Sequence, residues 1–222
     1  VAGMDTDDLT QIERSDAHLV QATLPRIFGV FLNQSHNTAL TDLAVRRALD
    51  EAVDKQAIVA SVLAGYGTTI GGPIPENVSP DAPATPRPIT PPAVTSRESE
   101  NTTSATTTLR ADRARAILQS GNWKWNATSE MWEKGSTKLT LILSTADEPA
   151  LVATAHMVEA DWRAAGIPVQ VNIYPISDFN TTILRPRNYD AILFGEVVGR
   201  STDLFAFWHS SQRNDPGLNL SM

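Results

Sequence analysis

Residues that could cooperate in nucleophilic catalysis occur near the end of the chain. His209 is followed directly by Ser210 and Ser211, and Asp203 lies a short distance upstream. A serine nucleophile needs a base within hydrogen-bond reach and an oxyanion hole, and adjacency in the sequence supplies neither. The chain also contains no G-x-S-x-G motif. We therefore expect a polar helix end here and no catalytic residues, with a serine hydrolase as a less favoured alternative.

The histidines and a glycine-rich segment are the next candidates for chemistry. The 4 histidines show no i, i+4 pairing and no H-E-x-x-H motif, and the chain has no cysteine. We therefore expect no metal site and no thiol chemistry. The segment 67–72 lacks the Lys-Ser/Thr step of a phosphate-binding loop, so no nucleotide or other cofactor is expected.

Glu196 and Trp208 are candidates for ligand binding. Glu196 follows an apolar run that begins at Ala191, and a carboxylate at the end of a buried strand can meet a ligand's amine or hydroxyl groups. The same carboxylate could instead cap a loop, and both interpretations stay open. Trp208 belongs either to the core or to an apolar subsite, because aromatic rings bury a large area in both places.

Alternating strands and helices must position these residues. Short apolar runs predict strands over 25–33, 139–143, 167–175 and 189–199. Helical spacing of apolar residues predicts helices over 41–65, 109–121, 147–166 and 177–186. The strand over 139–143 is apolar on both faces, as is typical of a buried strand, and Trp-containing segment 122–138 resembles a small hairpin.

Capping residues define the ends of several of these helices. Thr41 or Asp42 can cap the first helix, and Gly65 can adopt the left-handed stop. Pro149 suits the first turn of the helix over 147–166, and Ser177 is the expected cap of the last helix.

This order of elements predicts one α/β lobe spanning residues 1–222, in which helices flank a largely parallel or mixed sheet. Residues 81–108 form a low-complexity Pro/Ser/Thr-rich insertion, since 8 of the 14 prolines lie between Pro73 and Pro92. Ligands of such sheets meet the loops at the carboxyl ends of the strands. The predicted ends lie at Asn33, 144–147, 174–177 and 196–203.

Composition excludes further classes of function. The net charge of -7 argues against nucleic-acid binding, which relies on neutralisation of phosphates by Lys and Arg. No run of about 18 apolar residues is present, so we expect no membrane span. The acidic N-terminus does not resemble a signal peptide, and an exported protein would therefore be represented here by a fragment.

Four segments resemble, in order, the family 5 extracellular solute-binding proteins, which are the oligopeptide-, dipeptide- and nickel-binding components of ABC importers. The first is LAVRRALDEAVDKQAIVASVLAGYGTTIGGPIP, which is similar to the family's helix and following loop after a strand that ends in Asn. The others are ADRARAILQSGNW, MVEADWRAAGIPVQVNIYPISDF and STDLFAFWHSSQRNDPGLNLS.

The resemblance implies the second lobe of a bilobal, type II periplasmic-binding-protein fold. Its first lobe, lipoprotein signal and C-terminal return segment would lie outside this chain. It further implies an extracytoplasmic, lipid-anchored protein that is not an enzyme. Such a protein binds a peptide or similar small solute in an interlobe cleft and delivers it to an ABC permease in the membrane.

The chain departs from the family pattern at the ligand-binding step. In peptide-binding members an Asp after the strand matching 191–195 pairs with the ligand's α-amine, and here Gly199 occupies that position. Glu196 could replace that Asp, Arg200 could serve an anionic ligand, or the ligand is not a peptide. The expected ligand-binding residues are Asn33, Gly72, Pro73, Glu196, Val197, Val198, Arg200, Asp203 and Trp208.

Two further alternatives remain open at this stage. A cytoplasmic ligand-sensing effector domain of a transcription regulator shares the two-lobed α/β plan, but it needs a helix-turn-helix arm, which these residues do not contain. A lobe retained for protein interaction alone would bind no solute.

Overall fold

The computed structural model describes residues 26–72, 99–197 and 205–221, with the backbone alone for 99–106 and 196–197. The elements in chain order are β1 (Arg26–Leu32), η1 (Thr38–Thr41), α2 (Leu43–Ala52), α3 (Lys55–Val62), α4 (Ser99–Ser120), β2 (Lys124–Asn126), β3 (Met131–Lys134), β4 (Thr137–Lys138), β5 (Leu141–Ala146), α5 (Pro149–Ala164), β6 (Val169–Tyr174), α6 (Ile176–Asp178), η3 (Phe179–Leu184), β7 (Ala191–Val197), α7 (Phe205–Trp208) and η4 (Ser210–Gln212). This order confirms the predicted α/β pattern.

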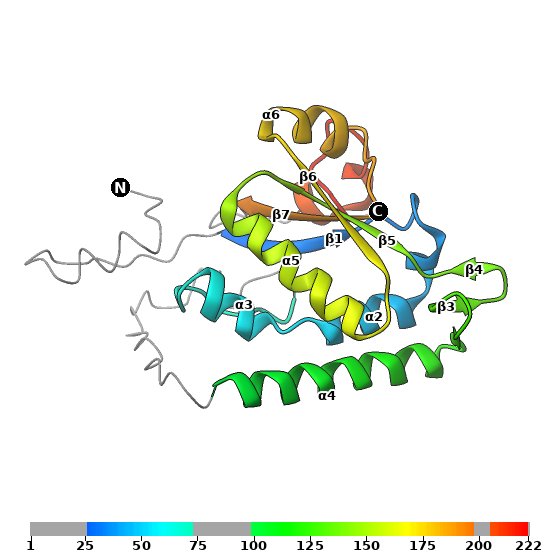
Figure 1. Ribbon diagram of the computed structural model, residues 1–222. Helices are drawn as coiled ribbons and strands as arrows, with labels where there is room; N and C mark the ends of the chain where they lie inside the picture. Colours follow the sequence, from blue (N-terminus) through cyan, green and yellow to red (C-terminus); the bar gives the residue numbers. More distant parts are fainter. Residues whose placement is uncertain (1–25, 73–98, 198–204, 222) are drawn as a thin grey trace, which may run out of the picture.

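The main sheet has four strands in the order β1-β7-β5-β6 (Figure 1). β5 is parallel to both of its neighbours, β6 and β7, whereas β1 runs antiparallel to β7. The sheet is therefore mixed, as predicted. β1 and β6 are its two edge strands.

Helices cover both faces of this sheet. In Figure 1, α2, α3 and α5 lie on one side, with α4 packed outside α2, and α6 with the C-terminal segment lies on the other. Ile192 and Leu193 are neighbours on β7 and therefore point to opposite faces, yet both are buried. The core thus continues through the sheet.

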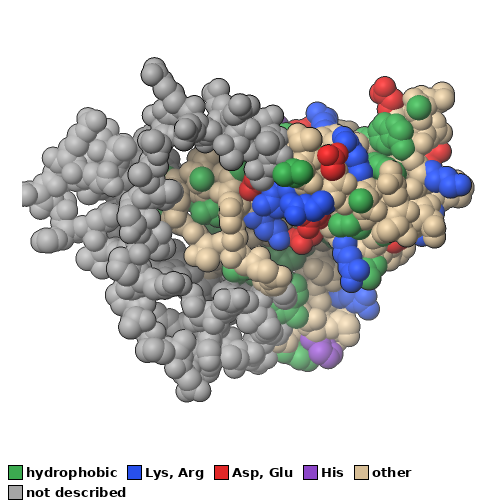
Figure 2. All heavy atoms as spheres, turned by 90° about the horizontal axis from the view of Figure 1, so that it is seen from below, with side chains coloured by type: hydrophobic (Ala, Val, Ile, Leu, Met, Phe, Trp, Pro, Cys, Tyr) green, Lys and Arg blue, Asp and Glu red, His purple; other side chains and the backbone are tan. Residues whose placement is uncertain are grey.

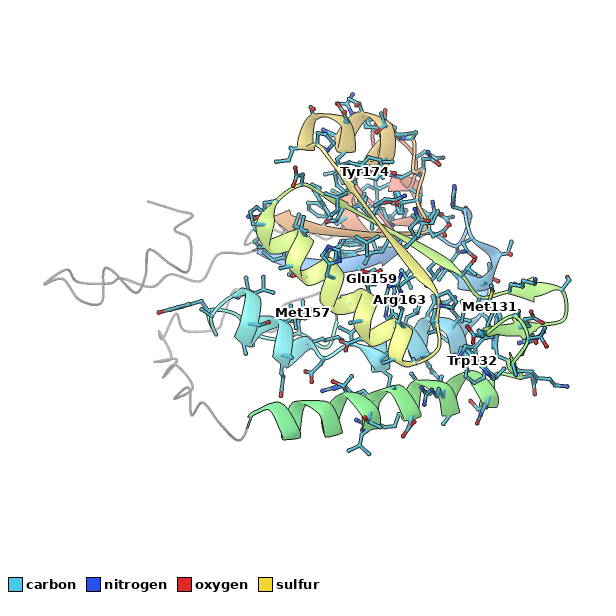
Figure 3. All side chains as sticks on the ribbon, viewed as in Figure 1. Met131, Trp132, Met157, Glu159, Arg163 and Tyr174 are labelled. Atoms are coloured by element: carbon cyan, nitrogen blue, oxygen red, sulfur yellow. The ribbon has the colours of Figure 1, made fainter. Side chains whose placement is uncertain are left out.

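Helix α5 carries the main apolar stripe. Leu151, Ala155, Val158 and Trp162 are buried and recur at spacings of three and four residues, which places them on one face. On its other face, the Glu159 carboxylate accepts from Arg163, and Arg163 also donates to the Val169 carbonyl at 2.9 Å (Figure 3). Helix α5 is thereby tied to the start of the edge strand β6.

A second, three-stranded sheet packs against the helical layer and confirms the predicted hairpin. Trp132 donates to the Ala165 carbonyl at 3.1 Å, next to Gly166, whose φ of 80° and close neighbours leave no room for a side chain. Trp123 and Lys134 both donate to Asp42, the N-cap of α2. Burial opposes ionisation of Asp42, but hydrogen bonds from Lys134, the Ala44 N–H and Trp123 outweigh it and lower the pKa of that carboxyl.

The prediction of a single helix over 41–65 is wrong, because Val53 and Asp54 interrupt the helix and separate α2 from α3. The Asp54 carboxylate accepts from the Ala57 N–H at 3.0 Å and so caps α3. The Asp54 N–H donates a hydrogen bond to the carboxylate of Asp161 on α5, at 2.9 Å, instead of to a helical carbonyl. The predicted stop holds, since Gly65 has φ of 81°.

The Asp161 carboxyl lies near the Asp54 carboxylate and the Arg110 guanidinium, and its ionisation is unfavourable. Burial raises the pKa of Asp161, and the Asp54 carboxylate adds to the rise, against the Asp54 N–H bond and the charge of Arg110. Because the pKa of Asp161 is higher in the folded state than in the unfolded state, stability falls as the pH rises through the interval between these two pKa values. Asp161→Asn keeps an acceptor for the Asp54 N–H and removes this cost. We expect it to raise the melting temperature at pH 7 by a few degrees.

Thermal unfolding across pH tests this prediction. The advantage of Asp161→Asn should shrink on acidification and vanish below about pH 4, where the unfolded-state carboxyl is also protonated. Asp112→Asn, at an exposed carboxylate of α4, should show no such pH-dependent gain. A gain for Asp161→Asn that stays constant down to pH 4, or a loss at pH 7, would contradict the assignment.

Other predicted boundaries and faces differ from the structure. The helix expected from Leu109 begins at Ser99, because α4 packs along α2 and a nucleated helix extends readily through adjoining residues. Pro175, not Ser177, occupies the N-cap of α6. Ile142 is 38% exposed, since β7 begins opposite Leu143 and leaves Ile142 uncovered on that side.

The face formed by α4 is rich in arginine, but its charges are matched. Figure 2 shows Lys and Arg side chains gathered in the described part of this face, with acidic side chains beside them. Arg110, Arg113 and Arg115 pair respectively with Asp54, Glu51 and Asp112. These three arginines therefore do not form an unpaired cationic surface of the kind that binds nucleic acid.

Candidate functional site

The directions of the strands define two edges of the main sheet. β5, β6 and β7 all end on the same side of the sheet, and we call this border, formed by strand ends, the carboxyl edge; it is distinct from the lateral edge strands β1 and β6. β1 begins at the carboxyl edge, because Arg26 pairs with Val197. β1 ends at the opposite edge, where Leu32 pairs with Ala191. Figure 1 shows β7 and β1 pointing in opposite directions. The loops that commonly bind ligands in such sheets follow β5, β6 and β7.

Asn33 therefore lies at the opposite edge from Glu196, and the expectation that the two share one edge is wrong. The physical reason is the antiparallel direction of β1, which the sequence does not reveal. Asn33 is 2% exposed, and both the oxygen and the nitrogen of its side-chain amide are hydrogen-bonded. Its Oδ1 accepts from the N–H groups of Ser35 and His36, and its Nδ2 donates to the Arg187 carbonyl at 2.9 Å. This is the pattern of a residue that holds a turn.

His36 and Asp190 extend this bonding at the same opposite edge. The Asp190 carboxylate accepts from the Ile142 N–H at 3.0 Å, and its other oxygen lies 2.7 Å from His36 Nδ1. The backbone N–H of Asn33 also donates to the Asp190 carbonyl. The polar groups of this edge thus bind one another and join β1, β5 and β7.

The carboxyl edge, in contrast, carries exposed apolar side chains. Ile173 near the end of β6 is 42% exposed, Ile176 at the start of α6 is 64% exposed, and Phe28 on β1 is 42% exposed. Ile173 is uncovered because it lies on β6, an edge strand of the sheet. Exposed apolar side chains at the ends of sheet strands are available to meet a ligand or another part of the protein.

Aromatic residues support this edge from the side of α6. Tyr174, the last residue of β6 and labelled in Figure 3, packs against Phe179 with ring centroids 6.4 Å apart. Phe179 in turn packs against Phe194 of β7 at 5.8 Å. Phe179 lies in the π-helical turn η3, a geometry that is frequent at functional sites. The three aromatic rings therefore form a packed row that joins the end of β6 to β7 near the carboxyl edge.

The other predicted ligand-binding residues are placed only in part. Glu196 and Val197 are the last two residues of β7, at the carboxyl edge. Gly72 is exposed, and a side chain there would meet nothing within 4 Å. Pro73, Val198, Arg200 and Asp203 lie outside the described residues.

Trp208 packs on the core side. It is partly buried against the core, and its ring stacks on Phe31 of β1 with centroids 6.2 Å apart. Its indole Nε1 is buried and has no hydrogen-bond partner in the described part of the chain. Trp208 therefore belongs to the support of β1 rather than to the carboxyl edge.

The His209 segment is a local turn. His209 caps η4, where its Nδ1 accepts from the Ser211 N–H at 3.2 Å and lies 2.8 Å from Ser211 Oγ. All of these groups are exposed, and the proposed third member Asp203 is outside the described residues. The contact follows from neighbouring positions on one turn, as expected for a polar helix end.

The described residues carry neither a metal-binding cluster nor a membrane-spanning helix. No group of three or more His, Asp and Glu side chains there converges as metal ligands. No helix among them is both long and apolar enough to cross a membrane.

Comparison with protein families shows one match that covers nearly the whole chain. The model of the bacterial extracellular solute-binding proteins, family 5 (middle), matches residues 1–217. No curated protein sequence matches the chain.

Solved structures of binding proteins share the fold. The oligopeptide-binding protein AppA from Bacillus subtilis, in complex with a nonapeptide, is 22% identical with a TM-score of 0.73. The match covers 96% of this chain and 39% of that protein. NikZ from Campylobacter jejuni, in complex with Ni(L-His), is 20% identical with a TM-score of 0.70, covering 98% of this chain and 40% of that one. The chain thus spans about two fifths of the length of these proteins.

Proposed function

This chain belongs to family 5 of the bacterial extracellular solute-binding proteins, and from this membership we propose that it forms one wall of a solute site in the binding protein of an ABC importer. The observation that carries the proposal is the family match over residues 1–217. It favours solute binding over the effector domain of a regulator and over a serine hydrolase. We propose no catalytic role for any residue.

The wall of the solute site is proposed to be the carboxyl edge. The exposed Ile173, Ile176 and Phe28 supply apolar area there, whereas the polar groups at the opposite edge already bind one another. The resemblance adds Glu196 and Val197 at the end of β7, Val198, Arg200 and Asp203 after it, and Gly72 and Pro73 after α3. Asn33 and Trp208 have supporting roles in this account.

A second lobe is proposed to complete the site, because the matched structures are more than twice as long as this chain. Solute bound between the lobes would favour their closed arrangement, and closure would change the surface offered to the permease. The whole protein is proposed to act outside the cytoplasm as a lipid-anchored partner of an ABC permease.

A peptide or related small solute is the proposed ligand. AppA was solved with a nonapeptide and NikZ with a nickel–histidine complex. The described residues offer no cluster of metal-ligating side chains, which favours a ligand that is recognised through apolar and hydrogen-bonding contacts.

Mass spectrometry of small molecules that co-purify with the full-length protein tests this proposal. We expect peptides or related solutes, with Glu196→Gln weakening their binding by about tenfold or more, as loss of one charge-assisted hydrogen bond would. Glu130→Gln, in the turn between β2 and β3, serves as the control and should bind normally. Recovery of no solute, together with no binding of a peptide library, would contradict the proposed function.

A further inference from the structure

Arg26 and Phe28 form a pair on the strand β1 at the carboxyl edge. They are two positions apart and therefore point to the same face of the sheet. The Arg26 guanidinium carbon lies 4.6 Å from the centroid of the Phe28 ring. Their cross-strand partners are Val197 and Gly195, the last and third-last residues of β7. The pair thus lies beside the strand end from which the proposed ligand-binding segment departs.

Gly195 provides the space that this pair occupies. A Cβ built at Gly195 would lie 2.7 Å from Phe28 Cε1 and 3.1 Å from Arg26 Nε. A contact as short as 2.7 Å is essentially never seen and one of 3.1 Å is tight, so the Phe28 ring and the Arg26 guanidinium both lie close over the glycine backbone. The missing side chain on β7 is therefore a structural condition for the Arg26–Phe28 arrangement.

The charge of Arg26 is not matched by any carboxylate in the part of the chain that the structure describes. Arg110, Arg113 and Arg115 on α4, in contrast, each have an acidic partner. Arg26 is exposed, and among the described side chains its guanidinium contacts the face of the Phe28 ring. An aromatic face orients a guanidinium while leaving its N–H donors free for a planar anion.

We propose that Arg26, held over Phe28, binds a carboxylate group of the solute and so selects carboxylate-bearing ligands. This inference rests on the proposed function, because it assigns one contact within the solute site at the carboxyl edge. Guanidinium and carboxylate groups match in a bidentate geometry, which a neutral amide cannot reproduce. The exposed ring of Phe28 would pack against the apolar part of the solute next to that carboxylate.

Calorimetric titration of the full-length protein with two peptide libraries tests the inference. The libraries share one composition without Asp or Glu, and they differ only in having C-terminal carboxylates or C-terminal amides. We expect the wild type to bind the carboxylate library about tenfold more tightly, which corresponds to one charge-assisted hydrogen-bonded contact. Arg26→Gln should reduce this preference to within about twofold, and Phe28→Leu should reduce it about threefold through loss of the cation–π contact.

Arg47→Gln is the matched control, since Arg47 is an exposed arginine on α2. It should keep the full preference, and both arginine variants should melt at the temperature of the wild type. A carboxylate preference that survives in Arg26→Gln would overturn the inference and leave the proposed function intact. Equal binding of both libraries by the wild type would also overturn the inference and leave the proposed function intact. Failure of the wild type to bind either library would contradict the proposed function and, with it, this inference.

Discussion

Replacing Trp162 by alanine is expected to lower the free energy of unfolding by about 3–5 kcal/mol, the range found when a large aromatic core side chain is removed. Trp162 is 2% exposed and joins α5 to α2 across the helical layer. Its Nε1 donates to the Leu49 carbonyl at 3.0 Å. Leu49 lies in the last turn of α2, so this carbonyl has no helical partner of its own. The variant would lose packing and leave that carbonyl unpaired.

Urea unfolding followed by circular dichroism measures this loss. Trp125→Ala removes the same side chain from a site that is 45% exposed, and it should cost less than about 1.5 kcal/mol. Trp162→Phe keeps most of the ring, and it should fall between the two because it loses chiefly one hydrogen bond. Equal losses for Trp162→Ala and Trp125→Ala would show that α5 does not depend on this buried contact.

Replacing Asn33 by alanine is expected to lower the free energy of unfolding by about 2–4 kcal/mol, because three hydrogen bonds are lost and buried groups are left unpaired. The affected groups are the N–H groups of Ser35 and His36 and the Arg187 carbonyl. Solute affinity should stay within about twofold of the wild type, since Asn33 lies at the edge away from the proposed site.

Asn180→Ala is the control for this prediction. Asn180 is exposed in η3 and should tolerate the change with little loss of stability. Unfolding and solute titration are measured on the same preparations. A variant of Asn33 that keeps wild-type stability but loses solute binding would return Asn33 to the site and reverse the assignment of the two edges.

Local signals in the sequence were sufficient for the order of elements and for helix α5. Pro149 at its first turn and Gly166 after its end are visible without any knowledge of tertiary contacts, and both have the predicted roles. Such signals act over a few residues, so they remain readable in a single sequence. The alternation of strands and helices likewise sufficed for the α/β class.

The break at Asp54 shows where local patterns stop being informative. Apolar spacing continues through residues 41–65, but the Asp54 N–H bonds to Asp161, which is remote in sequence. The extra capping bond to Ala57 was available locally, since an Asp after an apolar pair can start a helix. Packing against α5 favours this capping bond over continuation of the helix through Asp54.

The candidate site was predictable only at β7. The strand and its end at Glu196–Val197 follow from the apolar run, but the direction of β1 does not, and that direction moves Asn33 to the other edge. Arg26 and Phe28 were missed because their arrangement depends on the pairing of Phe28 with Gly195. A glycine inside an apolar strand was the one available signal of a close neighbour.

Hydrogen–deuterium exchange of the full-length protein, with and without its co-purified solute, tests the location of the site most directly. We expect slower exchange with solute at the carboxyl edge, in residues 26–29, 147–151, 174–178 and 195–197. Residues 33–42 and 187–191, at the opposite edge, should exchange at unchanged rates. Protection at 33–42 and 187–191 with none at the carboxyl edge would contradict the account.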